Sequence, residues 1–167
     1  MNIILFDQSR ENLLPLTFLR PVADIRCGIL TLAQKWKIIS NANISYLTEN
    51  YLSKKFPLTH SADNIYIAGN LIGTSGLWEF IKELEPNQKL MISNQLVALR
   101  SSQKYSTANE IEQAPGKAFF FGEDFSGDSH IRFIQYPFHI FANNDFAIKQ
   151  DFDLLTTNRK SQAISST

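Results

Sequence analysis

The chain has 167 residues, of which 44% are hydrophobic and 19% are charged, the balance of an ordinary globular domain and not of a disordered segment. Sixteen basic residues balance sixteen acidic ones, which argues against an extended nucleic-acid or anionic-membrane surface but leaves room for a small anion site. The single cysteine, Cys27, cannot form an internal disulfide, and no apolar run approaches the roughly 20 residues of a membrane helix. We therefore expect one soluble domain in the reducing cytoplasm, with no nucleic-acid or membrane partner.

The first predicted elements are a buried strand and a helix joined by a long polar loop. Residues 2–6 (NIILF) form an apolar run that ends at Asp7, as in a strand buried on both faces. Apolar residues then recur at helical spacing over residues 29–39, with Lys35 and Lys37 outside the apolar stripe. Loops this long are often functional, and this one follows the carboxyl end of the first strand, where open α/β sheets bind ligands.

The pattern of alternating strands and helices continues up to Pro86. We expect, in order, a strand at 44–48, a short helix at 50–56, a strand at 64–68, and a helix that Thr74 or Ser75 caps and that stops at Pro86. This β-α-β-α-β-α order favours a parallel sheet with helices on both faces.

After Pro86 the sequence no longer predicts alternating strands and helices. It predicts a hairpin of strands at 89–93 and 96–100, a polar surface excursion at 101–117, strands at 118–121 and 131–141, and a helix at 143–155. The side chains of this last helix expected to face inward are Phe146, Ala147, Phe152 and Leu155. The predicted fold is a three-layer α/β sandwich, mostly parallel and Rossmann-like, with an antiparallel portion in the second half. One domain would span residues 1–156, with a polar tail or linker at 157–167.

If the long loop binds phosphate, it must do so through side chains. Residues 7–21 contain no glycine, so a glycine-rich cradle of main-chain N–H groups is absent from the sequence. The loop's cationic side chains are Arg10, Arg20 and Arg26, and guanidinium groups suit phosphate oxygens. The acids beside them are Asp7, Glu11 and Asp24. Each arginine either meets a ligand anion or pairs with one of these acids and holds the loop in place.

Other candidates have ordinary structural explanations. The three histidines, His60, His130 and His139, lie far apart with no second ligand at metal spacing. Turn chemistry explains the acids Glu123, Asp124 and Asp128 as well as metal binding does. The aromatic residues of the second half either build the core or cover a partner-facing patch that mediates oligomerisation.

The run LLPLTFLRP resembles the PLTxxxPK segment of sugar-1-phosphate nucleotidyltransferases, and residues 3–36 as a whole resemble a divergent branch of that family found in bacterial chains. Residues 142–162 resemble the end of that branch's first domain, which often precedes a hexapeptide-repeat β-helix with acyltransferase character. The resemblance implies a Rossmann-like nucleotidyltransferase fold. It also implies that an NTP and a sugar 1-phosphate give a nucleotide-sugar and pyrophosphate, with Mg²⁺ as cofactor.

The resemblance also implies roles for individual residues. Arg10, Arg20 and Arg26 would be the catalytic charge clamps, Asp7, Asn12, Thr17 and Gly69 would bind the nucleotide, and Asn70 would stand at the metal position. The sequence departs from the family pattern in three places: DQSRENLL replaces the glycine-rich loop, Val22 replaces a lysine, and Asn70 replaces an aspartate. Either the site has been rebuilt from other residues, or the domain is a catalytically weakened nucleotide-binding or scaffold module attached to an acyltransferase.

Overall fold

The computed structural model describes residues 2–92, 94–120, 131–157 and 159–160. Its strands are β1 (Asn2–Phe6), β2 (Asn43–Leu47), β3 (Asn64–Ala68), β4 (Gln88–Ile92), β5 (Gln95–Ser101) and β6 (Lys117–Phe120). Its helices are α1 (Leu32–Ser40), α2 (Ser75–Lys82), α3 (Ala108–Gln113) and α4 (Pro137–Thr156), with 3₁₀ turns at Glu11–Leu13, Val22–Asp24 and Asn50–Leu52. None of these described helices is long and apolar enough to span a membrane.

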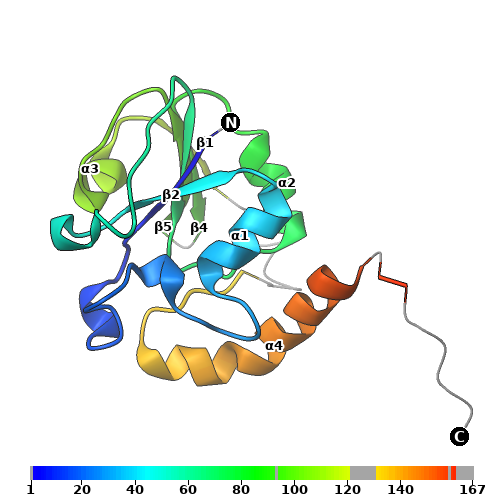
Figure 1. The fold of residues 1–167 in the computed structure, drawn as a ribbon. Helices are drawn as coiled ribbons and strands as arrows, with labels where there is room; N and C mark the ends of the chain where they lie inside the picture. The colour runs from blue at the N-terminus through cyan, green and yellow to red at the C-terminus, as the bar shows by residue number, and fades with distance from the viewer. Residues whose placement is uncertain (1, 93, 121–130, 158, 161–167) are drawn as a thin grey trace, which may run out of the picture.

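One six-stranded sheet with the order β2-β1-β3-β5-β4-β6 forms the centre of the fold. β1 pairs in parallel with both β2 and β3, whereas β5 is antiparallel to β3 and to β4, and β6 returns to parallel pairing on β4. In Figure 1, α1 and α2 cover one side of the sheet and α3 lies on the other. This arrangement confirms the predicted three-layer α/β sandwich, mostly parallel with an antiparallel portion in the second half.

Local sequence explains the best-defined elements. β1 and β3 are buried along their whole length, as their unbroken apolar runs predict. The side chain of Thr74 accepts a hydrogen bond from the N–H of Leu77 and so caps α2. Trp36 of α1 is fully buried in the main core against the sheet.

The structure corrects several predictions for the rest of the chain. Residues 131–141 are no strand: Phe133 forms a single bridge with Leu71, and α4 already begins at Pro137, where the fixed φ of proline suits a first helical turn. The excursion at 101–117 contains α3, capped by Thr107, and the short helix at 50–56 is only a 3₁₀ turn. The acids at 123, 124 and 128, His130, and most of the predicted tail lie outside the described residues.

Two burial predictions are also wrong. Phe152 and Leu155 point outward from α4, because the inner side of this helix is taken by Asn143, Ala147 and Asp151. Lys35, expected outside the apolar stripe of α1, is fully buried. Both errors have the same origin, since α4 packs on the loop after β1 through polar as well as apolar side chains.

Candidate active site

The carboxyl ends of three parallel strands meet at one edge of the sheet. Asp7, Thr48 and Gly69 are the first residues after β1, β2 and β3, and the strand register places them side by side. The N–H of Gly69 donates to the carbonyl of Phe6 over 2.8 Å, and a Cβ added at Gly69 would lie 2.8 Å from that oxygen. Glycine is therefore needed here, because the turn after β3 presses against the end of β1.

Asp7 organises the start of the loop. Its carboxylate accepts hydrogen bonds from the N–H of Val22 (2.8 Å), the hydroxyl of Thr48 (2.6 Å) and the guanidinium of Arg10 (2.6 Å). Burial raises the pKa of the Asp7 carboxyl, while these three donors act in the opposite direction. Asp7 thus ties the start of the loop, and Val22 further along it, to the end of β2.

Arg10 holds the loop from inside. Besides Asp7, its guanidinium donates to the backbone carbonyls of Thr17 and Arg20 and to the hydroxyl of Tyr51. Only 12% of the Arg10 side chain is exposed. Thr17 is buried beside it and donates its hydroxyl to the carbonyl of Arg10. For Arg10, then, the structure shows the pairing with a neighbouring acid, and contact with a ligand anion stays a prediction.

A cavity of about 480 Å³ opens over the ends of β1 and β2. We call it the strand-end cavity. Its lining consists of Asp7, residues 9–12, residues 47–50, residues 106–108 and Glu112. Glu11, Glu49 and Glu112 add to the charge of Asp7, whereas Arg10 is the one basic side chain among the described lining residues. An anionic ligand would therefore have to enter this cavity together with a cation.

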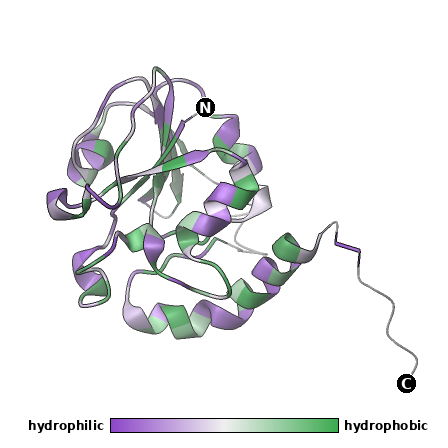
Figure 2. Ribbon diagram, viewed as in Figure 1, coloured by the Kyte–Doolittle hydropathy of each residue, from purple (hydrophilic) through white to green (hydrophobic). Residues whose placement is uncertain are grey.

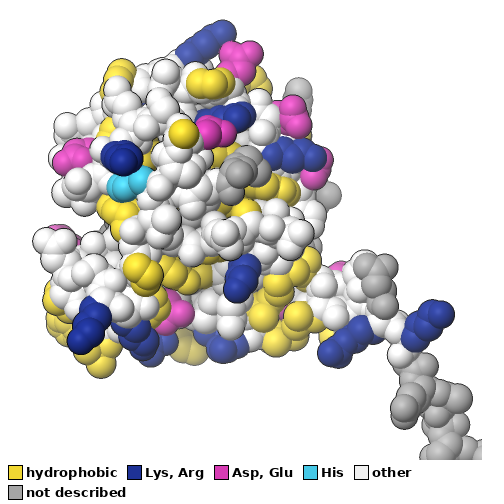
Figure 3. Space-filling model, turned by 45° about the horizontal axis from the view of Figure 1, so that its top comes forward, with side chains coloured by type: hydrophobic (Ala, Val, Ile, Leu, Met, Phe, Trp, Pro, Cys, Tyr) yellow, Lys and Arg dark blue, Asp and Glu magenta, His cyan; other side chains and the backbone are white. Residues whose placement is uncertain are grey.

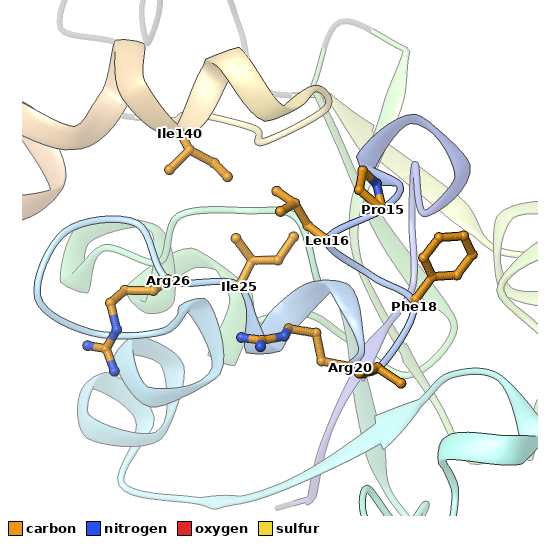
Figure 4. Close-up of a pocket in the computed structure, with 8 residues that line it drawn as sticks. Pro15, Leu16, Phe18, Arg20, Ile25, Arg26 and Ile140 are labelled. Atoms are coloured by element: carbon orange, nitrogen blue, oxygen red, sulfur yellow. The ribbon is translucent and has the colours of Figure 1, made fainter.

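Arg20 and Arg26 line a different cavity. This loop cavity, of about 490 Å³, is bounded mainly by apolar side chains of the loop and by Ile140 of α4 (Figure 4). Arg26 donates to the backbone carbonyl of Ile29, and within the described ranges neither Arg20 nor Arg26 forms an ion pair. The three arginines that the sequence groups together are thus divided between two cavities.

Two buried amide oxygens near the strand ends have no hydrogen-bond partner. They are Oδ1 of Asn70, a fully buried residue just beyond β3, and Oε1 of Gln8, just beyond β1. The Nδ2 atom of Asn70 lies 3.5 Å from the hydroxyl of Ser9, at the start of the loop. The described residues contain no cluster of three or more acidic, His or Cys side chains able to hold a metal. Neither Gln8 nor Asn70 lines the strand-end cavity, and Mg²⁺ binds mainly through carboxylates and substrate phosphates, so these two amide oxygens do not form a metal site open to a nucleotide in that cavity.

The end of the loop is anchored by α4. Asp151 accepts hydrogen bonds from the N–H groups of Ile29 (2.8 Å) and Leu30 (3.0 Å) and forms an ion pair with Lys35. Gly28, with φ of +85°, lies so close that an added Cβ would be 2.6 Å from Oδ2 of Asp151. The loop is therefore fixed at one end by Asp7 and at the other by Asp151.

Sequence reasoning missed Thr48, Tyr51 and Asp151 as parts of this arrangement. The rule that identified Asp7, a polar residue directly after a buried strand, would also have identified Thr48. No local signal identifies Tyr51 or Asp151, because their partners are distant in the chain. Asn12, predicted to bind nucleotide, lines the strand-end cavity.

Surface charge adds to this description. On the face drawn in Figure 3, basic side chains are interspersed with acidic and hydrophobic ones.

The search of curated proteins gave no match to the chain. A family model described as sugar nucleotidyl transferase matches residues 3–160, nearly the whole length. The chain therefore belongs to the sugar nucleotidyl transferase family.

Proposed function

We propose that this domain transfers a nucleotidyl group from an NTP to a sugar 1-phosphate, giving a nucleotide-sugar and pyrophosphate. The observation that carries the proposal is the strand-end cavity, which lies where parallel α/β sheets bind ligands, in a chain of this family. Its volume of about 480 Å³ is within the usual range for small-molecule sites.

In the proposed reaction, an oxygen of the sugar phosphate attacks the α-phosphorus of the NTP in line. The new bond joins this oxygen to the α-phosphorus, the bond from the α-phosphorus to the bridging oxygen breaks, and pyrophosphate leaves with the electron pair. The protein contributes positioning and stabilisation of charge. Asp7 and Arg10 would keep the loop in shape, and Asn12 on the cavity wall would hydrogen-bond the nucleotide.

The excess of carboxylates in the cavity gives Mg²⁺ a role in this proposal. Bound Mg²⁺ would neutralise phosphate charge next to Glu11 and Glu49. Carboxylate oxygens of these two side chains on the cavity wall, together with the phosphates, would hold it. Asn70, the metal position that the family resemblance implies, does not line this cavity.

One observation favours a second candidate, a nucleotide-binding or scaffold module without turnover that serves an attached acyltransferase. Arg10, the basic side chain of the strand-end cavity, donates to Asp7, to backbone carbonyls of the loop and to Tyr51. Phosphoryl-transfer sites normally direct such cations at the phosphates.

Pyrophosphate release separates the two candidates. The purified chain is incubated with each NTP, Mg²⁺ and a panel of sugar 1-phosphates, and thermal shifts with the NTPs are measured in parallel. Release of pyrophosphate supports the transferase, a nucleotide-dependent shift without release supports the nucleotide-binding module, and the absence of both effects overturns the transferase and any nucleotide-binding role.

Variants locate the nucleotide. We expect Asn12→Ala to weaken nucleotide binding about 10-fold, the usual order for one lost hydrogen bond to a charged ligand. Arg20→Ala and Arg26→Ala in the loop cavity are the matched comparison. If these two weaken binding and Asn12→Ala does not, the nucleotide lies in the loop cavity and the assignment to the strand-end cavity is wrong.

A further inference from the structure

Helix α4 has two different faces. Its inner face carries the buried residues Asn143, Ala147 and Asp151, four residues apart, and Asp151, together with the neighbouring Asn144, accepts N–H groups of the loop. Its outer face carries the exposed apolar side chains of Phe138, Phe141, Ile148, Phe152 and Leu155. We call these five residues the α4 stripe. Figure 1 shows α4 along the outside of the molecule, below α1, and Figure 2 shows hydrophobic segments recurring along it.

The α4 stripe follows a heptad repeat. Phe138 and Phe152 occupy one core position of the repeat, a, and Phe141, Ile148 and Leu155 occupy the other, d. Asp145 stands at the remaining a position, in the middle of the stripe, and forms an ion pair with Lys149 over 2.8 Å. This spacing is the one by which one helix packs along another helix.

The exposed area is large enough for a specific contact. Phe138 is 61% exposed, Phe141 82% and Phe152 59%. Taking about 200 Å² for a whole phenylalanine, and adding Ile148 and Leu155, the stripe exposes roughly 500 Å². That is at the upper end for a monomer surface, and covering it on two copies would bury roughly 1,000 Å², where specific interfaces begin.

We propose that the α4 stripe pairs with the α4 stripe of a second copy of this chain, antiparallel and related by a two-fold axis near residues 146 and 147. In this register Phe141 lies opposite Phe152, and Phe138 lies opposite Leu155. Asp145 then faces Ile148 and Lys149 of the second copy, so that opposite charges meet across the axis. A parallel pair would instead place Asp145 against Asp145, two like charges in the centre of the contact.

The oligomeric state of the 167-residue chain tests this proposal, measured by analytical ultracentrifugation over a range of concentrations. The wild-type chain should form dimers, and Phe141→Glu should raise the dissociation constant at least about 10-fold. Phe120→Glu on β6 is the matched control, since Phe120 is 58% exposed, and it should leave the dissociation constant unchanged. A wild-type chain that stays monomeric at about 100 µM, or a dimer that Phe141→Glu leaves intact, would overturn the proposal.

Charge exchange tests the contact across the axis. Asp145→Lys and Lys149→Asp should each weaken the homodimer, because each variant carries two like charges at the centre. Mixing the two variants should restore dimers, as heterodimers, and the double variant should restore homodimers. The result of mixing cannot come from the ion pair within one helix, so a mixture that remains monomeric contradicts the proposal.

Cross-linking tests the direction of the two helices. Under mild oxidation, an equal mixture of Phe138→Cys and Leu155→Cys should give a disulfide between the two variants, whereas each variant alone should not cross-link. Cross-linking of each variant with itself would mean a parallel pair and would overturn the antiparallel arrangement. The native Cys27 is buried, so it does not compete in this experiment.

Discussion

Asp151 of α4 and Lys35 of α1 form an ion pair in which each side chain is only 1% exposed. Burial lowers the pKa of Lys35, and the carboxylate of Asp151 opposes this shift. Asp151 also accepts the N–H groups of Ile29 and Leu30. One carboxylate thus satisfies a buried ammonium group and the backbone at the end of the loop, which makes it a structural counterpart of Asp7 at the loop's beginning.

Removing one partner of this pair should be strongly destabilising. Lys35→Met leaves Asp151 buried without its counter-charge, and we expect a loss of about 3–5 kcal/mol in the free energy of unfolding, measured by urea denaturation. Lys82→Met, which breaks the exposed pair with Glu79, is the control and should change stability little. If both variants lose the same free energy of unfolding, the buried Lys35–Asp151 pair contributes no more to stability than the exposed Lys82–Glu79 pair.

Gly28 should not tolerate a side chain. Gly28→Ala forces a Cβ onto a residue with φ of +85° and into contact with Asp151, and we expect a loss of at least about 2 kcal/mol. At Gly76 in α2, an added Cβ meets nothing within 4 Å, so Gly76→Ala should be neutral or stabilise the helix by up to about 1 kcal/mol. Thermal unfolding of both variants provides the comparison, and a neutral Gly28→Ala would refute the close packing of α4 on the loop.

Ionisation of Tyr66 should lower the stability of the protein at alkaline pH. Burial raises its pKa to about 12, and its hydroxyl donates to the carbonyl of Gln103 over 2.7 Å. Because the folded-state pKa lies above the ordinary value of 10.0, the stabilisation from the neutral phenol is complete below pH 10 and is lost as the pH rises through about 12. Tyr66→Phe should remove this part of the alkaline loss of stability. In the same variant, the titration of tyrosinate absorbance should lose the ionisation near pH 12, and an unchanged titration would contradict the assignment.

Thr48 should stabilise the ionised carboxylate of Asp7. Thr48→Val removes a 2.6 Å hydrogen bond to the carboxylate, and we expect a loss of about 1 kcal/mol in the free energy of unfolding. Since this donor favours the charged form, the pKa of Asp7 should rise further in the variant, which NMR titration of the carboxyl can measure. The exposed Thr59→Val is the control, and a pKa of Asp7 that does not move in Thr48→Val would argue against the contact.

The sequence was informative where local pattern decides structure. β1 and β3 have the predicted bounds of 2–6 and 64–68, because an unbroken apolar run between polar residues defines a buried strand. The sequence offers Thr74 or Ser75 as the cap of α2, and the structure has Thr74 there, in line with the preference of threonine for that position. The start of α4 was missed because the aromatic run before it also suits a strand, and packing on the loop decides for the helix.

The arrangement of the site depended on contacts between distant residues. Lys35 and Asp151 are separated by 116 positions, so no window of sequence reveals that they meet. Likewise, the choice between pairing and ligand binding for Arg10 depended on the position of Tyr51 and of the carbonyls of the loop, which only the folded chain defines. The division of the arginines between two cavities has the same cause.

The attachment of the loop to Asp151 has a consequence for synthesis on the ribosome. β1 leaves the exit tunnel early and can join β2 and β3 while translation continues, since domains begin to form from their amino-terminal parts. The carboxylate that fixes residues 29 and 30 is translated much later, so these two residues stay without this anchor until residue 151 has been made. A ribosome that stalls before residue 151 would therefore hold a chain whose long loop lacks the anchor at its second end.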